Sequence, residues 1–115
     1  MTDFTVGGSP RDVARAIEDH ALASGRVSAL VVPWESDATT LSMAVTSVKA
    51  DGWAIEHTDL GTIRLTDLGG NSTSVAIVAR ESEATTQAGL RAVFDRFGAE
   101  LHRQLTQQQD RPSPR

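Results

Sequence analysis

The stretch SEATTQAGLRAVFDRFGAELHRQL, residues 82–105, decides the fold because its apolar side chains recur every three or four positions. The apolar stripe consists of Leu90, Val93, Phe94, Phe97, Leu101 and Leu105. The charged residues on the other side are Asp95, Arg96, Glu100 and Arg103. This one-sided pattern is typical of an amphipathic helix that covers a core. We therefore expect a long helix from about residue 82 to residue 105, laid on a β-sheet.

The chain before this helix shows the period-two alternation of β-strands, interrupted by turn sequences. We expect strands at residues 27–34, 39–49, 53–58, 62–67 and 73–80. Turns are indicated at residues 35–37, 50–52, 59–61 and 69–71. Segment 39–49 also satisfies a helical pattern through Leu41, Val45 and Val48, but its Thr and Val content favours a strand.

The N-terminal part adds one strand, residues 3–6, and one short helix to this meander. Ser9 and Pro10 indicate the helix start, because Ser caps free N–H groups and Pro fits the first helical position. Gly25 supplies a left-handed stop, so the helix is expected over residues 10–24. The predicted fold class is α+β: an antiparallel sheet of five to six strands, with this short helix and the long C-terminal helix packed on one face.

Length and composition limit the class of protein. The 115 residues fit a single domain, expected over residues 1–106, with a disordered tail over residues 107–115. A hydrophobic share of 39% and a charged share of 23% are ordinary for a soluble globular protein. Only 4% of the residues are aromatic, which is too few for the stacking platforms that bind bases.

Charge and cysteine content exclude further classes. The net charge of -4 gives the chain no attraction to nucleic acid or anionic membranes. The lack of cysteine excludes disulfides and thiolate metal sites and fits a reducing cytoplasm. The first ten residues do not form a signal peptide, and the longest apolar run, residues 29–33, is too short to cross a bilayer. We therefore expect a cytoplasmic protein, and its preference for Arg over Lys is typical of a bacterial high-GC coding background.

No group of side chains in the sequence points to catalysis. The three histidines, His20, His57 and His102, lack the His-Glu-x-x-His spacing of a metal site, so neither a metal nor another cofactor is expected. Strand alternation places His57 on one face with Trp53 and Ile55, the face expected to line the interior. A ring there could hydrogen-bond a ligand carbonyl or act as a general base, but a solvated His at the sheet margin is favoured. Enzymatic activity is therefore not favoured.

Two stretches carry a likeness to a known family. Residues 4–17, FTVGGSPRDVARAI, run from a strand through Ser-Pro into a helix. Residues 61–77, GTIRLTDLGGNSTSVAI, form a glycine-turned hairpin before the final helix. In these features the chain resembles the helix-grip superfamily of polyketide cyclases, START domains and pollen-allergen-like proteins.

The resemblance implies that the C-terminal helix closes a curved sheet over a cavity for an apolar ligand. Any activity implied by it is of the cyclase or aromatase kind, and it transfers no catalytic residue to this chain. The chain is shorter than members of the superfamily, has one long helix where two short ones usually stand, and has one strand fewer. A smaller fold, with the order strand, helix, four strands, helix, is the structural alternative.

Two functions from different classes remain open. The first is a binding module for a small apolar ligand, whose candidate cavity wall is Trp34, Met43, Trp53, Ile55, His57, Ile63, Phe94 and Phe97. The second is a protein-interaction or homo-oligomeric assembly module with a solid core, paired through a strand edge or the first helix. The free volume between the sheet and the C-terminal helix distinguishes these two functions, because a drug-sized ligand needs at least ~300 Å³.

Overall fold

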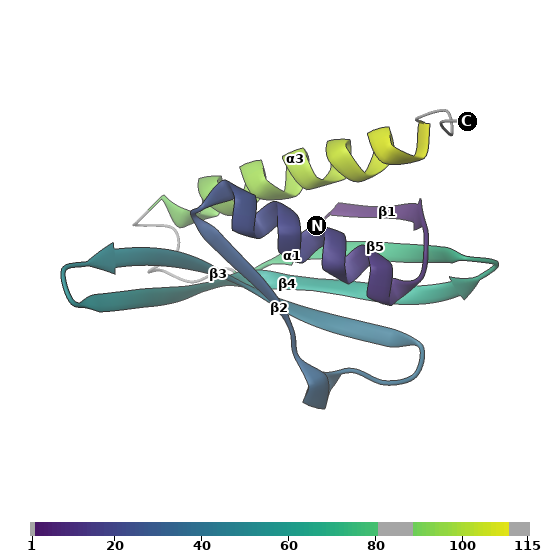
Figure 1. The fold of residues 1–115 in the computed structure, drawn as a ribbon, viewed down its shortest axis with the longest axis horizontal. Helices are drawn as coiled ribbons and strands as arrows, with labels where there is room; N and C mark the ends of the chain where they lie inside the picture. The colour runs from purple at the N-terminus through teal and green to yellow at the C-terminus, as the bar shows by residue number, and fades with distance from the viewer. Residues whose placement is uncertain (1, 81–88, 111–115) are drawn as a thin grey trace.

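Five antiparallel strands form one sheet with two helices on one face, in the part of the chain that the structure describes (Figure 1). The computed structural model describes residues 2–80 and 89–110. The elements are β1 (Thr2–Gly7), α1 (Pro10–Ser24), β2 (Val27–Val31), η1 (Pro33–Glu35), β3 (Thr40–Asp51), β4 (Ala54–Gly69), β5 (Ser72–Ala79) and α3 (Leu90–Asp110). The strand order is β1-β5-β4-β3-β2, so α1 carries the chain from one sheet edge to the other.

This arrangement confirms the predicted α+β class. The described elements follow the order of the smaller alternative: strand, helix, four strands, helix. Residues 40–51 form a strand, which is the choice that the Thr and Val content favoured. The two strands expected at 53–58 and 62–67 are one continuous strand, β4, so the turn expected at residues 59–61 is wrong.

A one-residue bulge in β4 replaces the expected turn. Val45 of β3 pairs with Gly61, and the next residue, Thr46, pairs with Asp59. Leu60 therefore has no partner of its own on β3, and its side chain is completely buried. Because side chains alternate along a strand, one extra residue moves every position beyond it to the opposite face.

The first helix begins and ends where the sequence predicted. The Ser9 hydroxyl accepts a hydrogen bond from the N–H of Asp12 at 3.2 Å, and Pro10 occupies the first helical position. The helix ends at Gly25, whose φ of 72° lies in the left-handed region that favours glycine. Its buried face consists of Val13, Ala14, Ile17 and Ala21.

The core lies between the sheet and the two helices. The α3 residues in it are Phe94, Phe97, Leu101 and Leu105, as the stripe predicted. The strand residues opposite include Met43, Val45, Ile63, Leu65, Val75 and Ile77. Gly61 lets α3 approach closely, because a Cβ there would lie only 2.7 Å from Cζ of Phe94.

The ends of the predicted C-terminal helix fall partly outside the described residues. Its expected first residues, 82–88, are not among them, and neither are residues 111–115 of the expected tail. Within the described range α3 continues to Asp110, so the helix includes residues 107–110 of the expected tail.

The β3–β4 hairpin extends beyond the helices (Figure 1). Among the described strands, β2 pairs with β3 only as far as Ser47, and β5 pairs with β4 only from Gly61 onward. Residues 48–57 therefore form a two-stranded ribbon, which we call the arm. Its turn contains Gly52, whose φ of 61° is readily adopted by glycine, and Trp53.

Candidate functional site

The eight residues expected to line a cavity divide between the core and the surface. The buried members, each at most 3% exposed, are Met43, Ile63, Phe94 and Phe97. The exposed members are Trp34, Trp53, Ile55 and His57. The eight side chains therefore do not surround one cavity, and the buried four pack together between the sheet and α3.

The expectation that Trp53, Ile55 and His57 face the interior is wrong, and the bulge is the physical reason. The prediction rests on the apolar Trp53 and Ile55, which share a face with His57 in the strand expected at residues 53–58. In β4 the extra residue at Leu60 reverses the alternation that runs from the buried Ile63, so Ile55 and His57 lie on the face opposite to Ile63. The arm also extends beyond the helices, which leaves these side chains uncovered.

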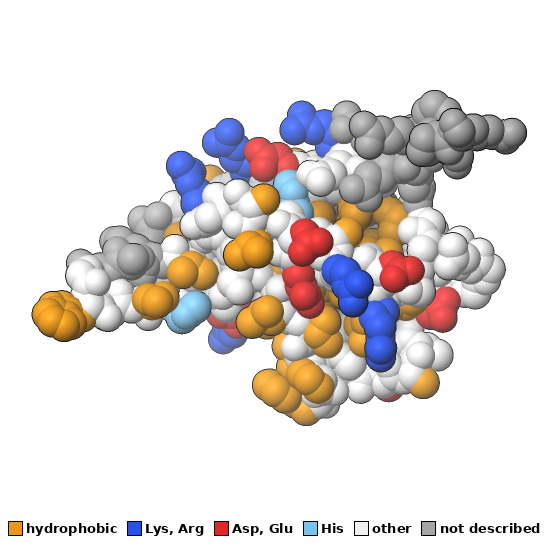
Figure 2. Space-filling model, in the orientation of Figure 1, with side chains coloured by type: hydrophobic (Ala, Val, Ile, Leu, Met, Phe, Trp, Pro, Cys, Tyr) orange, Lys and Arg blue, Asp and Glu red, His pale blue; other side chains and the backbone are white. Residues whose placement is uncertain are grey.

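The sheet face turned away from α1 and α3, which we call the outer face, carries exposed apolar side chains. One row crosses four strands: Leu30, Ala44, Thr62 and Val78. Leu30 and Val78 are exposed, and Ile55 is exposed farther along the hairpin. In Figure 2, hydrophobic side chains gather at the free end of the arm and around η1, whereas charged side chains gather over the helices.

Trp34 stands on η1, beside the outer face. The N–H of Ser42 donates to Oγ of Ser36 at 3.1 Å, and Oγ of Ser42 donates to the carbonyl oxygen of Glu35 at 3.2 Å. The end of η1 thus covers Ser42, a residue of the outer face, and buries it. The neighbouring indole of Trp34 stays exposed, so it extends the apolar surface of the outer face, while the exposed Trp53 lies at the turn of the arm.

The loop after η1 is fixed by a carboxylate. Oδ1 of Asp37 accepts hydrogen bonds from the N–H of Thr39 at 2.8 Å and of Thr40 at 2.9 Å, and from the Thr39 hydroxyl at 3.1 Å. The backbone hydrogen bond from Thr39 contributes most to a lowered pKa of Asp37, because these donors favour the charged carboxylate. The charge of Asp37 therefore helps to hold the segment that carries Trp34.

Charges on the outer face are balanced among the described residues. Asp59 and Arg80 form an ion pair at 2.5 Å. Asp3 and Arg64 lie in one row, because both pair with Ala76 of β5. The described strands therefore give this face two acidic and two basic side chains, and the neighbouring η1 segment adds the acidic Glu35 and Asp37.

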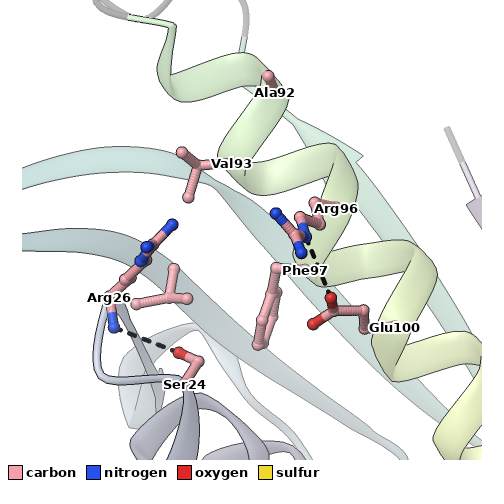
Figure 3. A pocket seen from close by; sticks show the side chains of 8 residues that line it. Ser24, Arg26, Ala92, Val93, Arg96, Phe97 and Glu100 are labelled. Atoms are coloured by element: carbon pink, nitrogen blue, oxygen red, sulfur yellow. Dashed lines mark hydrogen bonds and ion pairs between the residues drawn. The ribbon is translucent and has the colours of Figure 1, made fainter.

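A groove of about 430 Å³ lies on the helix side, between the start of α3 and the junction of α1 with β2. Val27 and Phe97, both buried, contribute its apolar floor. Arg26 and Arg96 flank it from opposite sides, and Nε of Arg96 contacts Oε1 of Glu100 at 3.2 Å (Figure 3). No local motif in the sequence marks this groove, because its residues come together only through the packing of α3.

The three histidines occupy different environments. His20 lies against Phe97 with ring centroids 5.4 Å apart, and its buried Nε2 has no hydrogen-bond partner in the described structure. His102 stacks on Phe4 at 4.2 Å, while His57 is exposed on the arm. Within residues 2–80 and 89–110, no three His, Cys, Asp or Glu residues are placed to hold a metal ion.

Comparison with known proteins returns no match among family models, curated proteins or solved structures. The helix-grip hypothesis therefore depends on residues 4–17 and 61–77 and on the order of the elements. No helix in the described part of the chain is long and apolar enough to cross a membrane.

Proposed function

We propose that this chain is a protein-interaction module whose arm and outer face are covered by a second copy of the chain. The exposure of both tryptophans carries the proposal: Trp34 is 83% exposed and Trp53 is fully exposed. Tryptophan is highly buried on average, so its exposure in a domain with a filled core is informative. Tryptophan is also enriched among the residues that dominate interface energies.

The extent of exposed apolar surface supports the same function. Each indole can bury about 150–250 Å², and the largest apolar patch of a typical monomer measures about 300–600 Å². Leu30, Ile55 and Val78 are exposed on the outer face, Trp34 stands beside this face on η1, and Trp53 lies at the turn of the arm. Covering this surface stabilises a complex by roughly 25 cal/mol per Å², less the entropy lost on association.

Charge balance favours a second copy as the partner. Among the described side chains of the strands, Asp3, Asp59, Arg64 and Arg80 give the outer face two acidic and two basic groups, so the strands of two such faces do not repel one another through net charge. In a two-fold dimer each contact occurs twice, so Asp3 of one copy and Arg64 of the other can approach as a symmetric pair. The short side chains of Ala44 and Thr62 allow two sheets to pack at about 10 Å.

A second proposal places a small apolar ligand between the sheet and α3, in the helix-grip manner. The long α3 lying across an antiparallel sheet, with β1 and β2 at its two edges, supports this proposal. The packing of Phe94 and Phe97 against Met43 and Ile63 counts against it, because a ligand would have to displace them. We therefore place the interaction module first.

Sedimentation velocity over a wide range of concentration tests the first proposal. The wild type is expected to form a reversible dimer, and Trp53→Ser with Leu30→Gln should weaken self-association at least about tenfold, or 1.4 kcal/mol. Leu22→Gln is the matched control, because Leu22 is also exposed but lies on α1. A monomer at every concentration, or equal weakening by the control, would contradict the proposal.

A thermal-shift screen with flavonoids and polyketide-like aromatics tests the ligand proposal. A ligand seated in the interior should raise the melting temperature by several degrees in the wild type and equally in His57→Ala, since His57 lies outside the interior. A melting temperature that depends on protein concentration, with no response to any compound, favours assembly.

A further inference from the structure

The groove beside α3 has the size and floor of a small-molecule site. Its volume of about 430 Å³ falls within the range of ligand pockets, about 300–1,000 Å³. Val27, Val93 and Phe97 give it an apolar surface on the helix side of the sheet. The groove is therefore separate from the outer face that we propose to pair with a second copy.

Two guanidinium groups flank this apolar surface. Figure 3 shows Arg26 reaching from the α1–β2 junction toward Val93, with the guanidinium of Arg96 across the gap. Arg96 is paired with Glu100, whereas the guanidinium of Arg26 has no hydrogen-bond or ion-pair partner in the described structure. Among the described residues, the lining thus holds two cations and one anion, a positive site on a chain with a net charge of -4.

The dipoles of the two helices do not change the positive charge of this groove. The C-terminal end of α1, which is negative, borders the groove at Ser24, and the N-terminal end of α3, which is positive, borders it at Ala92. These opposite ends offset one another, so the arginine side chains decide which charge the groove attracts.

We infer that this groove binds a small amphipathic anion, a carboxylate with a short apolar body. The carboxylate lies between Arg26 and Arg96, where planar guanidinium groups donate paired hydrogen bonds. The apolar body lies on Val27, Val93 and Phe97 and is removed from water there. A neutral or cationic molecule of the same shape is stabilised only by the burial of its apolar body.

Isothermal titration calorimetry with octanoate tests this inference, with octanol, octylammonium and acetate as comparison probes. We expect octanoate to bind about tenfold or more tightly than octanol, which corresponds to the charge-assisted hydrogen bonds of the carboxylate. Octylammonium should bind more weakly still, and acetate should not bind measurably because it lacks the apolar body.

Arg26→Gln should weaken octanoate binding about tenfold without changing octanol binding, since only the charged contact is lost. Arg103→Gln is the matched control: it removes the same charge from an exposed position of α3 that does not line the groove. Equal losses in the two variants would overturn the inference by showing a non-specific charge effect. Equal affinity for octanol and octanoate, or no binding of octanoate, would overturn it as well.

Discussion

The helix-covered part of the sheet and the arm belong to the same two strands but differ in burial. Ile63 of β4 is completely buried, whereas Ile55, earlier in the same strand, is 64% exposed. The residue type and the strand are the same, so the difference comes from the bulge at Leu60 and from the reach of the helices. Burial in this sheet is therefore decided by register and coverage rather than by residue type.

The covered part and the arm therefore contribute to different properties, the first to folding stability and the second to binding of a partner. Side chains on the covered part contribute most of the free energy of folding, because they leave water when the chain folds. Side chains on the arm remain in water in the isolated chain, so their burial energy is available to a partner. Substitutions in the covered part should therefore change the free energy of unfolding strongly, and substitutions on the arm should change it little.

The largest expected effect is at Phe94, which is 2% exposed and packs over Gly61. Phe94→Ala should lower the free energy of unfolding by about 3–5 kcal/mol, because it leaves a cavity at the centre of the core. Urea denaturation followed by circular dichroism measures this change. A loss no larger than that of a surface substitution would show that α3 does not stabilise the sheet.

A smaller loss is expected for Gly61→Ala. The new Cβ would meet the carbonyl oxygen of Val78 and lie 2.7 Å from Cζ of Phe94, so the backbone or the ring must move. We expect a loss of about 1–3 kcal/mol in the free energy of unfolding.

Gly98→Ala is the matched control for Gly61→Ala. Its Cβ would lie 3.6 Å from Cγ2 of Ile77, an ordinary contact, and alanine favours the helix by about 1 kcal/mol. The control should therefore be neutral or stabilising. A comparable loss of unfolding free energy in both variants would mean that the close approach of Phe94 to Gly61 does not require glycine.

The fold could be predicted to the extent that it depends on local patterns. The stripe that includes Phe94 and Phe97 predicted α3, and Ser9 and Gly25 predicted the two ends of α1. The bulge could not be predicted in this way, because residues 59–61 contain a Gly and an Asp as a true turn does. Only the pairing with β3 shows that the chain continues in the same direction.

The candidate site was harder to predict than the fold. The apolar Trp53 and Ile55 predicted an interior face that includes His57, whereas the bulge at Leu60 and the limited reach of the helices leave this part of β4 exposed. The groove depends on contacts between Arg26 and the side chains of α3, which are distant in the sequence and share no motif. Tertiary packing brings such lining residues together, and no local pattern in a single sequence predicts that they will meet.

A still smaller effect is expected at Asp37, outside the core. Its folded pKa lies below the ordinary 3.8, so the charged carboxylate stabilises the folded state above that pH. This contribution is lost as the pH falls through the lower, folded pKa. Asp37→Asn should therefore remove a part of the acid sensitivity of unfolding, measured by urea denaturation between neutral and acidic pH.

Asp19→Asn is the control for the loss of one carboxylate, because Asp19 is exposed on α1. Asp37→Asn and Asp19→Asn with the same pH dependence would show that the hydrogen bonds from Thr39 and Thr40 do not matter. The wild type and Asp37→Asn are expected to converge in stability at low pH, once Asp37 is protonated.

The smallest effect is expected on the arm, at Ile55. The same substitution at Ile63 compares the arm directly with the helix-covered part of β4. Ile55→Thr keeps a β-branched side chain on the exposed arm, so the free energy of unfolding should change by no more than about 0.5 kcal/mol. Ile63→Thr, the matched variant, places a hydroxyl in the core and removes packed carbon, and should cost at least about 2 kcal/mol. Urea denaturation of dilute protein measures both changes without self-association. Equal losses would mean that the arm is packed in solution and that Ile55 is not available to a partner.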